Sequence, residues 1–405
     1  MINDAEEKLN DVSQLSFGQE KVTHEIFDQV KKHFSDDNPY VIWLDGDAGT
    51  GKSVVLTELF KKIQYESRTQ KNTCLYQTSN YLTVNHAEVI KVYKGIAGKE
   101  PHLYKKDVQK PTTLINRLQK ENKKADVVLI DEGHLLLTQP DRYNNFNQTN
   151  QLDELIKQAK IVVIVFDEHQ FLKTKSFWTN QKLQSILQKY CHKKFKLTEQ
   201  FRLKAPTEVL NWIDNFAKER QLVKYPESGN YDFRLYTDLS TMYQDLKQKN
   251  SQYGLSRLIS TADYPYKLDG KLYYITEPGF RLPWDHDINP NLPWAQRPET
   301  INEVGSIYTI QGFDLNYAGV IIGPGITYDK KTNQIIPKPK YYQDFEAFKK
   351  SSDENSNQQL LTIKEQIMMN AVNVLLKRGA YGLFIYASDS NLKEAFANFN
   401  SNNWK

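Results

Sequence analysis

Short apolar runs rich in Val and Ile alternate with amphipathic stretches through the first half of the chain. Three of these runs, at residues 40–44, 127–130 and 161–166, are apolar without alternation, which is typical of strands covered on both faces. Residues 54–63 follow the first run with the spacing of a helix. Strands that alternate with helices predict a parallel sheet with crossover helices.

A second series of the same kind occupies the other half. We expect strands there at residues 233–236, 257–260, 319–322 and 383–386. A helix is expected at residues 207–219, with Thr207 as its N-cap. The polar stretch 188–194 separates the two series. The chain is therefore expected to form two α/β domains, residues 1–192 and residues 193–405.

Composition agrees with a folded protein and excludes several classes. Hydrophobic residues make up 39% of the 405 residues, with only 18 Gly and 15 Pro, so disordered and collagen-like chains are excluded. Residues 264–291 concentrate Pro, Gly and aromatic residues and are expected to be irregular. The net charge of +4 permits a polyanionic partner without arguing for one.

The cysteines and the apolar runs suggest where the protein acts. Cys74 and Cys191 are the two cysteines, too few and too far apart for a disulfide framework or a Cys-rich zinc site. Apolar runs such as residues 161–166 are far shorter than a membrane span, and the acidic N-terminus is unlike a signal peptide. We expect a reducing, cytoplasmic setting and no membrane partner.

The strongest local signal is GDAGTGKS at residues 46–53, which has the G-x-x-x-x-G-K-S pattern of a phosphate loop. It stands between a predicted strand and a predicted helix, which is the context such a loop requires. Its backbone N–H groups and the helix N-terminus favour phosphate, its lysine should reach the β and γ phosphates, and its serine should ligate Mg²⁺. The predicted site residues are Gly46, Gly49, Thr50, Gly51, Lys52 and Ser53.

Acidic and amide side chains follow the next two predicted strands. Asp131 and Glu132 come directly after residues 127–130, and adjacent carboxylates at a strand end are costly unless a cation uses them. We expect Asp131 to hold the Mg²⁺ shell and Glu132 to act as general base toward water, with a surface turn as the alternative. Gln170, after residues 161–166, is the candidate for sensing the γ-phosphate, although a capped strand end would also explain it.

Taken in order, seven elements resemble the superfamily 1 helicases and, more closely, the Schlafen-like DNA/RNA helicase domains. They are LSFGQ at 15–19, the phosphate loop, DEGH at 131–134, FDEHQ at 166–170, LTEQFR at 197–202, the block 304–323 and NVLLKRG at 373–379. The resemblance covers nearly the whole chain. It implies two RecA-like P-loop domains, each a mainly parallel sheet flanked by helices, with an ATP site in the cleft between them.

The same resemblance assigns roles to residues outside the phosphate loop. Gln19 matches the residue that binds adenine and selects ATP, and Arg202 and Arg378 match arginine fingers that stabilise charge on the transferring phosphoryl group. Thr309, Gln311 and Gly312 match a motif that couples nucleotide to nucleic acid. In these roles Lys52, Glu132, Gln170, Arg202 and Arg378 are the catalytic set.

The resemblance implies a Mg²⁺-dependent ATPase that binds single-stranded DNA or RNA and translocates on, unwinds or remodels it. The chain has no room for the large insertions of many superfamily 1 helicases, so hydrolysis is implied more firmly than unwinding. Any nuclease is expected to be a separate partner, because Gln19 lies close to the start. An ATP-dependent switch or scaffold that controls a partner, as in defence against mobile DNA, is the alternative, and a small-molecule kinase would leave the second half unexplained.

A single-stranded nucleic acid needs a basic groove with aromatic rings on which bases stack. The candidates for this groove are Tyr76, Tyr81, Trp284, Trp294, Arg257 and Lys267. Aromatic residues of this kind belong more often to a hydrophobic core than to a stacking platform, and the sequence does not resolve which of these do.

Overall fold

The computed structural model describes residues 15–46, 50–166, 176, 178, 180–197, 204–267, 269–286, 292–310, 313–344, 347–348 and 357–400. The chain divides into two compact units, one mainly of residues 5–201 and the other mainly of residues 202–405. They are called the N-terminal unit and the C-terminal unit below. Within the described ranges, no helix is both long enough and apolar enough to cross a membrane.

The N-terminal unit is built on a parallel sheet. Its described strands are β1 (Tyr40–Gly46), β2 (Asn80–Val84), β3 (Val108–Gln109), β4 (Ala125–Asp131), β5 (Ala159–Phe166) and β6 (Cys191–Leu197). They lie in the order β3-β2-β4-β5-β1-β6, and all neighbours are parallel. The carboxyl ends of β1, β4 and β5 therefore meet at one edge of the sheet, where the predicted motifs follow.

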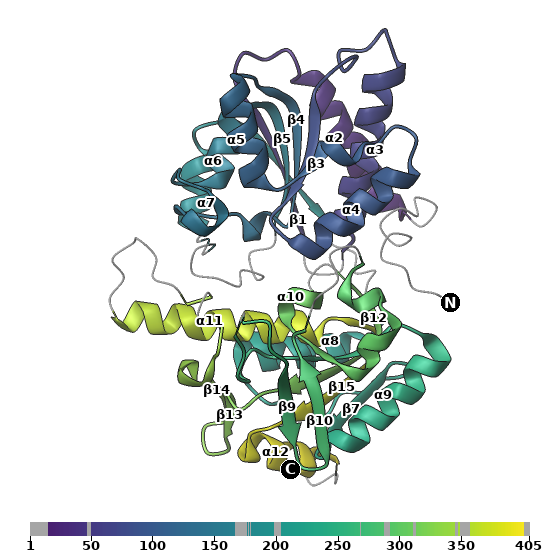
Figure 1. The fold of residues 1–405 in the computed structure, drawn as a ribbon, viewed down its shortest axis with the longest axis vertical. Coiled ribbons are helices and arrows are strands. Elements are labelled where there is room, and N and C mark those ends of the chain that lie inside the picture. The colour runs from purple at the N-terminus through teal and green to yellow at the C-terminus, as the bar shows by residue number, and fades with distance from the viewer. Residues whose placement is uncertain are drawn as a thin grey trace. The chain divides into compact units, whose positions relative to one another are not determined.

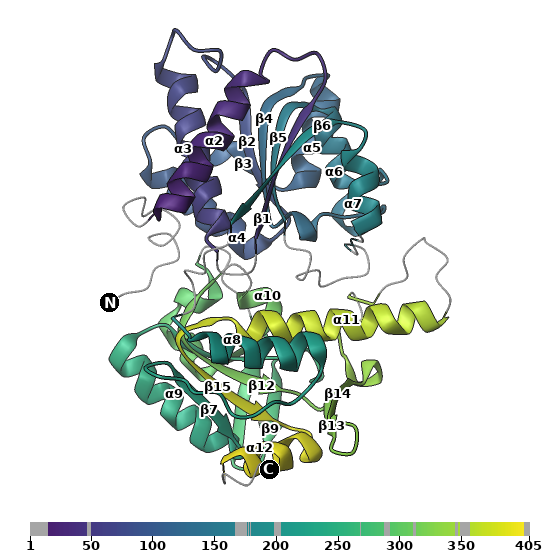
Figure 2. The ribbon, with the colours of Figure 1, turned by 180° about the vertical axis from the view of Figure 1, so that it is seen from behind.

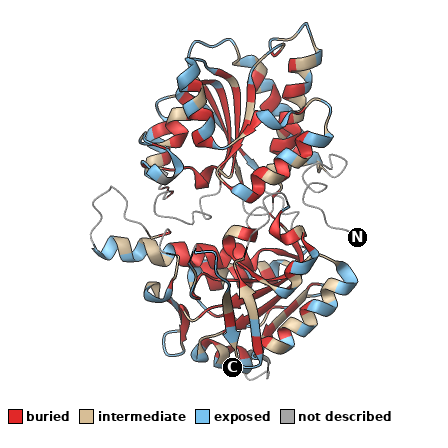
Figure 3. Ribbon diagram, viewed as in Figure 1, coloured by how far each residue is buried: buried red, intermediate tan, exposed pale blue. Residues whose placement is uncertain are grey.

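Helices cover both faces of this sheet. They are α2 (Phe17–Lys32), α3 (Lys52–Thr69), α4 (Ala87–Lys99), α5 (Pro111–Glu121), α6 (Gln151–Lys157) and α7 (Asn180–Leu187). Figures 1 and 2 show α2, α3 and α4 on one side and α5, α6 and α7 on the other. Val41 and Trp43 of β1 pack with Leu114 of α5, Leu152 of α6 and Leu183 of α7 in one buried cluster. Figure 3 shows how strongly burial concentrates on the strands.

The C-terminal unit contains a second sheet. Its described strands are β7 (Asp232–Tyr236), β8 (Ser256–Ser260), β9 (Tyr273–Glu277), β10 (Phe280–Trp284), β11 (Val304–Gly305), β12 (Leu315–Ile322), β13 (Ile326–Asp329), β14 (Gln334–Pro337) and β15 (Gly379–Ala387). Seven of these lie in the order β7-β15-β12-β8-β11-β10-β9, parallel except for the β9–β10 hairpin. The antiparallel pair β13–β14 stands apart from that sheet.

The helices of this unit are α8 (Thr207–Asp214), α9 (Leu239–Tyr253), α10 (Ile307–Ile310), α11 (Asn357–Leu376) and α12 (Ser390–Asn400). On one face of the sheet, α9 buries Met242 and Leu246 against Leu258 of β8, Ile321 of β12 and Phe384 of β15. The main sheets of both units are therefore mainly parallel and flanked by helices, and the predicted α/β fold class is confirmed. In the N-terminal unit, β5 separates the phosphate-loop strand β1 from β4, which is the RecA-like arrangement.

The first domain extends further than the predicted boundary at residue 192. That boundary falls inside β6, which pairs with β1 along its whole length. β6 is an edge strand on which only Phe195 and Leu197 are buried, and its other side chains are polar. Because these side chains are polar, the sequence pattern predicted a linker here. The contacts divide the chain after residue 201 instead.

Two smaller predictions, on residues 264–291 and on the start of α8, differ from the structure. Residues 264–291 were expected to be irregular, but they contain the β9–β10 hairpin, which turns at Gly279 with a φ of 70°. Thr207 is the first residue of α8, whose N-cap is Pro206. The predicted helix 207–219 continues beyond Asp214 as a π-helical turn at Asn215–Glu219.

Candidate functional site

The structure describes both ends of the predicted phosphate loop, at β1 and α3. β1 ends at Gly46 and α3 begins at Lys52, with Gly51 as an N-cap in the left-handed region at a φ of 79°. The Lys52 ammonium is buried and donates to the carbonyl oxygen of Gly46. A Cβ atom on Gly46 would lie 2.7 Å from Oγ1 of Thr50, so the tight loop needs glycine there. Gly49 lies outside the described residues.

Gln19 lies directly against this loop. Its backbone N–H and side-chain oxygen complete a capping box with Ser16 at the start of α2. Its amide Nε2 donates to the carbonyl oxygen of Thr50 at 3.1 Å, and a Cβ atom on Gly51 would collide with the same nitrogen. The structure therefore brings Gln19 to the phosphate loop. Its adenine-binding role stays a prediction.

Ser53 and Asp131 meet across the sheet edge. The Ser53 hydroxyl donates to Oδ1 of Asp131 at 3.1 Å, although the two residues come from α3 and β4. A hydroxyl and a carboxylate at this spacing are hard oxygen ligands of the kind that Mg²⁺ prefers, alongside phosphate and water. The residues that are present therefore fit the predicted cation.

The surroundings of Asp131 make its charge costly without a cation. The side chain is only 1% exposed, and both this burial and the adjacent Glu132 carboxylate raise the pKa of Asp131. Two donors besides Ser53 hold it: the Glu132 backbone N–H donates to Oδ1 at 2.9 Å, and the Tyr93 hydroxyl donates to Oδ2 at 2.6 Å. A bound cation would stabilise the ionised carboxylate that these donors hold in place.

Glu132 directly follows β4 in an uncommon backbone conformation. Its φ is 50°, in the left-handed region, and its Oε2 lies 3.1 Å from Nε2 of His134, a residue that is 1% exposed. The side chain of Glu132 is half-buried. It follows directly after Asp131, the carboxylate that accepts a hydrogen bond from Ser53. A half-buried carboxylate held by an imidazole at this position can accept a proton from a water molecule.

Gly133 is required between Glu132 and His134. A Cβ atom on Gly133 would lie 2.6 Å from Cδ1 of Ile164 and 2.8 Å from the carbonyl oxygen of Val165. Because a backbone atom cannot move aside cheaply, we expect Gly133→Ala to lower the free energy of unfolding by about 1–3 kcal/mol. Urea unfolding measures this.

The matched control for that substitution is Gly98→Ala. Gly98 lies in α4, where an added Cβ meets only the flexible end of Lys105, and alanine is the better helix former. We expect Gly98→Ala to keep or raise stability. Equal losses in the two variants would contradict a close-packing requirement at Gly133.

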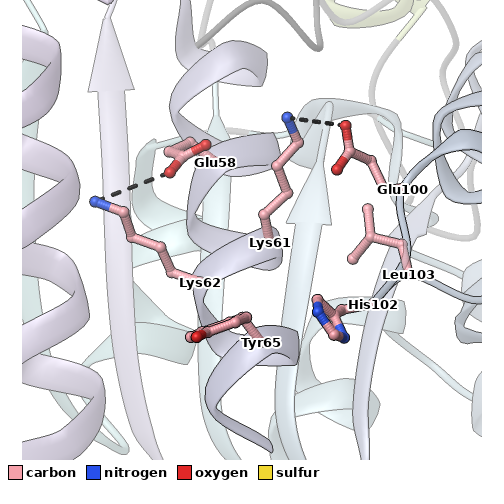
Figure 4. Close-up of a pocket in the computed structure, with 7 residues that line it drawn as sticks. All are labelled: Glu58, Lys61, Lys62, Tyr65, Glu100, His102 and Leu103. Atoms are coloured by element: carbon pink, nitrogen blue, oxygen red, sulfur yellow. Dashed lines mark ion pairs between the residues drawn. The ribbon is translucent and has the colours of Figure 1, made fainter. Parts of the chain in front are cut away.

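A separate pocket opens on α3, away from the phosphate loop. Its volume is about 250 Å³ and its lining residues are Glu58, Lys61, Lys62, Tyr65, Glu100, His102 and Leu103. Figure 4 shows its ion pairs, Lys61 with Glu100 at 3.7 Å and Lys62 with Glu58 at 3.9 Å. The lining residues on α3 lie roughly one and a half to three and a half turns from Ser53, and the others follow α4, so the pocket does not contain the predicted site residues.

Of the two predicted arginine fingers, Arg378 is the one that lies among the described residues. Arg378 lies between α11 and β15 with 2% of its surface exposed. Its Nε donates to the carbonyl oxygen of Val374 at 3.2 Å, and its Nη1 donates to that of Phe313 at 3.1 Å. Phe313 directly follows the predicted coupling residues, so Arg378 supports the backbone next to that motif. Its role as an arginine finger stays a prediction.

Among the predicted coupling residues, Thr309 is the one that lies in the described part of the chain. Thr309 is buried on α10, and its hydroxyl donates to the carbonyl oxygen of Ser306 at 3.0 Å. The remaining predicted residues of the site, Gln170, Arg202, Gln311 and Gly312, lie outside the described residues. The sequence remains the basis for their assignment.

The tryptophans proposed as stacking platforms belong to the core. Trp284 is 2% exposed and Trp294 is fully buried, so both rings belong to the core, the favoured alternative, and neither offers a stacking surface. Arg257 is also buried, and it donates to Thr300 and Asn250. Tyr76 and Tyr81 are half-buried and Lys267 is exposed.

Sequence reasoning missed Tyr93 and His134. His134 stands inside the DEGH motif, so its contact with Glu132 could have been anticipated from proximity. Tyr93 lies on α4, 38 residues before Asp131, and no local pattern marks it. Only the packing of α4 against the sheet edge brings its hydroxyl to the carboxylate.

The fold and the site together define a helicase-like P-loop protein, and such a loop implies nucleotide binding. The family model of the Schlafen group 3 DNA/RNA helicase domain matches residues 39–389. Uncharacterized protein YPL245W of Saccharomyces cerevisiae is 38% identical over 417 residues, which cover 96% of this chain and 91% of the yeast protein. The chain therefore belongs to the Schlafen group 3 helicase-domain family, and the resemblance inferred from the ordered motifs is confirmed.

Two solved structures are distantly similar to this chain. The Pif1 helicase from Candida albicans has 12% sequence identity and a TM-score of 0.37, covering 96% of this chain and 99% of that chain. The Pif1 helicase from Bacteroides, solved in complex with ADP-AlF3 and ssDNA, has 12% identity and a TM-score of 0.29, covering 96% of each chain. Family membership rests on the two sequence matches.

Proposed function

We propose that this protein is a Mg²⁺-dependent ATPase of the superfamily 1 helicase type, which binds single-stranded DNA or RNA and moves along or remodels it. The observation that carries the proposal is the hydrogen bond between Ser53 and Asp131, with Lys52 and Glu132 beside it. This bond joins the phosphate loop to the acidic strand end, so the hydroxyl, ammonium and two carboxylates needed for phosphoryl transfer lie at one sheet edge.

Each residue of the N-terminal unit has a distinct task in this proposal. The Lys52 ammonium exchanges the Gly46 carbonyl for phosphate oxygens, and the N-terminus of α3 adds favourable backbone donors. Ser53 and Asp131 hold Mg²⁺, which neutralises phosphate charge when it is bound. Glu132 accepts the proton of the attacking water. Gln19 binds adenine, and Gln170 senses the γ-phosphate.

The residues of the C-terminal unit act on the same reaction. We assign Arg202 and Arg378 as arginine fingers, because a planar guanidinium stabilises charge that spreads over the transferring phosphoryl group. For Arg378 this requires release of its bonds to Val374 and Phe313. Since Phe313 adjoins Gln311 and Gly312, such a release would reach the coupling motif directly.

The nucleic-acid part of the proposal rests on the family, whose model describes a DNA/RNA helicase domain. The net charge is only +4, so any groove for a polyanion must concentrate Lys and Arg locally. Local basic residues, not the overall charge, should therefore determine affinity.

We expect the purified protein to hydrolyse ATP only with Mg²⁺ and to be stimulated by single-stranded nucleic acid, because the coupling motif should transmit strand binding to the nucleotide. A steady-state ATPase assay with ssDNA, ssRNA and duplex measures this, with the Lys52→Ala variant as the control for contaminating activity. Hydrolysis that no nucleic acid stimulates would contradict the translocase assignment and favour a switch or scaffold.

A further inference from the structure

Tyr93 is a buried side chain whose hydroxyl serves the predicted metal ligand. It lies in the middle of α4 and is 3% exposed. The hydroxyl donates to Oδ2 of Asp131 at 2.6 Å, a short distance that is typical of an O–H donor on a carboxylate. Ser53 at the start of α3 donates to the other oxygen of the same carboxylate. Three elements, α3, α4 and β4, therefore converge on the Asp131 side chain.

The donors of Asp131 are divided between its two oxygens. Oδ1 accepts from the Ser53 hydroxyl and from the Glu132 backbone N–H, at 3.1 Å and 2.9 Å. Oδ2 accepts from Tyr93. Because each oxygen has its own donor, the carboxylate plane cannot rotate about its last bond without losing a bond. Removing the Tyr93 hydroxyl leaves Oδ2 without that donor, whereas Oδ1 keeps its bonds from Ser53 and Glu132, so the carboxylate is held at one oxygen only.

Burial alone does not account for a tyrosine at this position. Val89 and Ile96, which stand four residues before and three residues after Tyr93 on the same side of α4, are buried as well, so a phenylalanine ring would suit this apolar surrounding. A phenol that is almost fully buried is costly unless its hydroxyl has a partner. The hydroxyl therefore matters for what it contacts, which is Asp131.

We propose that Tyr93 is a positioning residue of the Mg²⁺ site, which orients the Asp131 carboxylate toward the cation from outside the ligand set. This inference rests on the proposed function, because it assigns a residue to the same site. Groups that orient metal ligands typically change metal affinity by about 10- to 100-fold when they are removed. The Tyr93 hydroxyl should act in this range without touching nucleotide or metal.

The test uses the full chain and a fluorescent, non-hydrolysable ATP analogue, so that binding is measured without turnover. We expect Tyr93→Phe to raise the Mg²⁺ concentration for half-maximal nucleotide binding by about 10-fold. Nucleotide affinity in excess chelator should stay unchanged, because the phosphate loop keeps Lys52. A merely structural role would weaken binding with and without Mg²⁺ alike.

Tyr190→Phe is the matched control. The Tyr190 hydroxyl donates to Oδ1 of Asp153 at 3.2 Å in the same unit, so this variant also removes a tyrosine–aspartate bond, but away from the phosphate loop. Its Mg²⁺ midpoint should equal that of the unmodified protein. In a second measurement, adding Tyr93→Phe to Asp131→Asn should shift the Mg²⁺ midpoint no further, since Tyr93 acts only through that carboxylate.

The outcomes separate this inference from the proposed function. A Tyr93→Phe midpoint equal to that of the unmodified protein, or an additional shift in the Asp131→Asn background, overturns the positioning role and leaves the ATPase proposal standing. If the unmodified protein binds no nucleotide with or without Mg²⁺, the proposed function fails and the inference falls with it.

Discussion

Replacing Lys52 with alanine is expected to reduce ATP hydrolysis by about 10²- to 10³-fold, the typical effect of removing one preorganised charge-stabilising group from a transition state. The ammonium is buried at the start of α3 and already faces the loop through the Gly46 carbonyl. In the proposed role, its removal takes one positive charge away from the phosphates, both in the bound nucleotide and in the transition state. Nucleotide binding should therefore weaken together with turnover.

The measurement is a steady-state ATPase assay paired with nucleotide-binding titrations. Lys61→Ala is the matched control, because Lys61 lies on the same helix, is mostly buried and pairs with Glu100 in the separate pocket of Figure 4. That variant should hydrolyse ATP at the normal rate. If folded Lys52→Ala protein keeps its activity, hydrolysis takes place elsewhere than at this loop.

The sequence predicted best those parts of the fold that are buried on both faces. β1, β4 and β5 are continuous apolar runs because helices cover both of their sides, and each was found within a few residues. β6 was missed because it is an edge strand. Lys194, for example, places its ammonium over the Trp43 ring, 4.0 Å from the centroid, and pairs with Asp45. A polar strand of this kind leaves no hydrophobic pattern.

In the candidate site, too, the residues that belong to a local sequence pattern could be predicted, and those that depend on distant packing could not. Lys52 and Ser53 could be predicted because a phosphate loop needs its residues at fixed spacing, and Asp131 and Glu132 because they follow a buried strand. Tyr93 could not be predicted, because its contact depends on how α4 packs. Trp294 was a candidate both for the core and for base stacking, and only its packing shows that it is fully buried.

Glu132→Gln is expected to reduce hydrolysis by about 10²- to 10⁴-fold, the contribution of a general base, while ATP binding persists. Glutamine has nearly the same shape and can keep its contact with His134, but its amide cannot accept the proton of the attacking water. Lys52, Ser53 and Asp131 remain in place, so the residues that we propose for nucleotide and metal binding are unchanged. The variant should therefore hold ATP without turning it over.

Single-turnover hydrolysis and nucleotide-binding titrations together test this separation of binding from chemistry. Glu58→Gln is the matched control, because Glu58 is a buried glutamate of α3 whose pKa is already raised by burial, and it lines the separate pocket. Unchanged hydrolysis in Glu132→Gln would mean that another group accepts the proton. Loss of ATP binding would instead place Glu132 among the binding residues. Lys52→Ala should impair both steps and Glu132→Gln only one, so the pair of variants distinguishes an ATPase site from a loop that merely holds nucleotide.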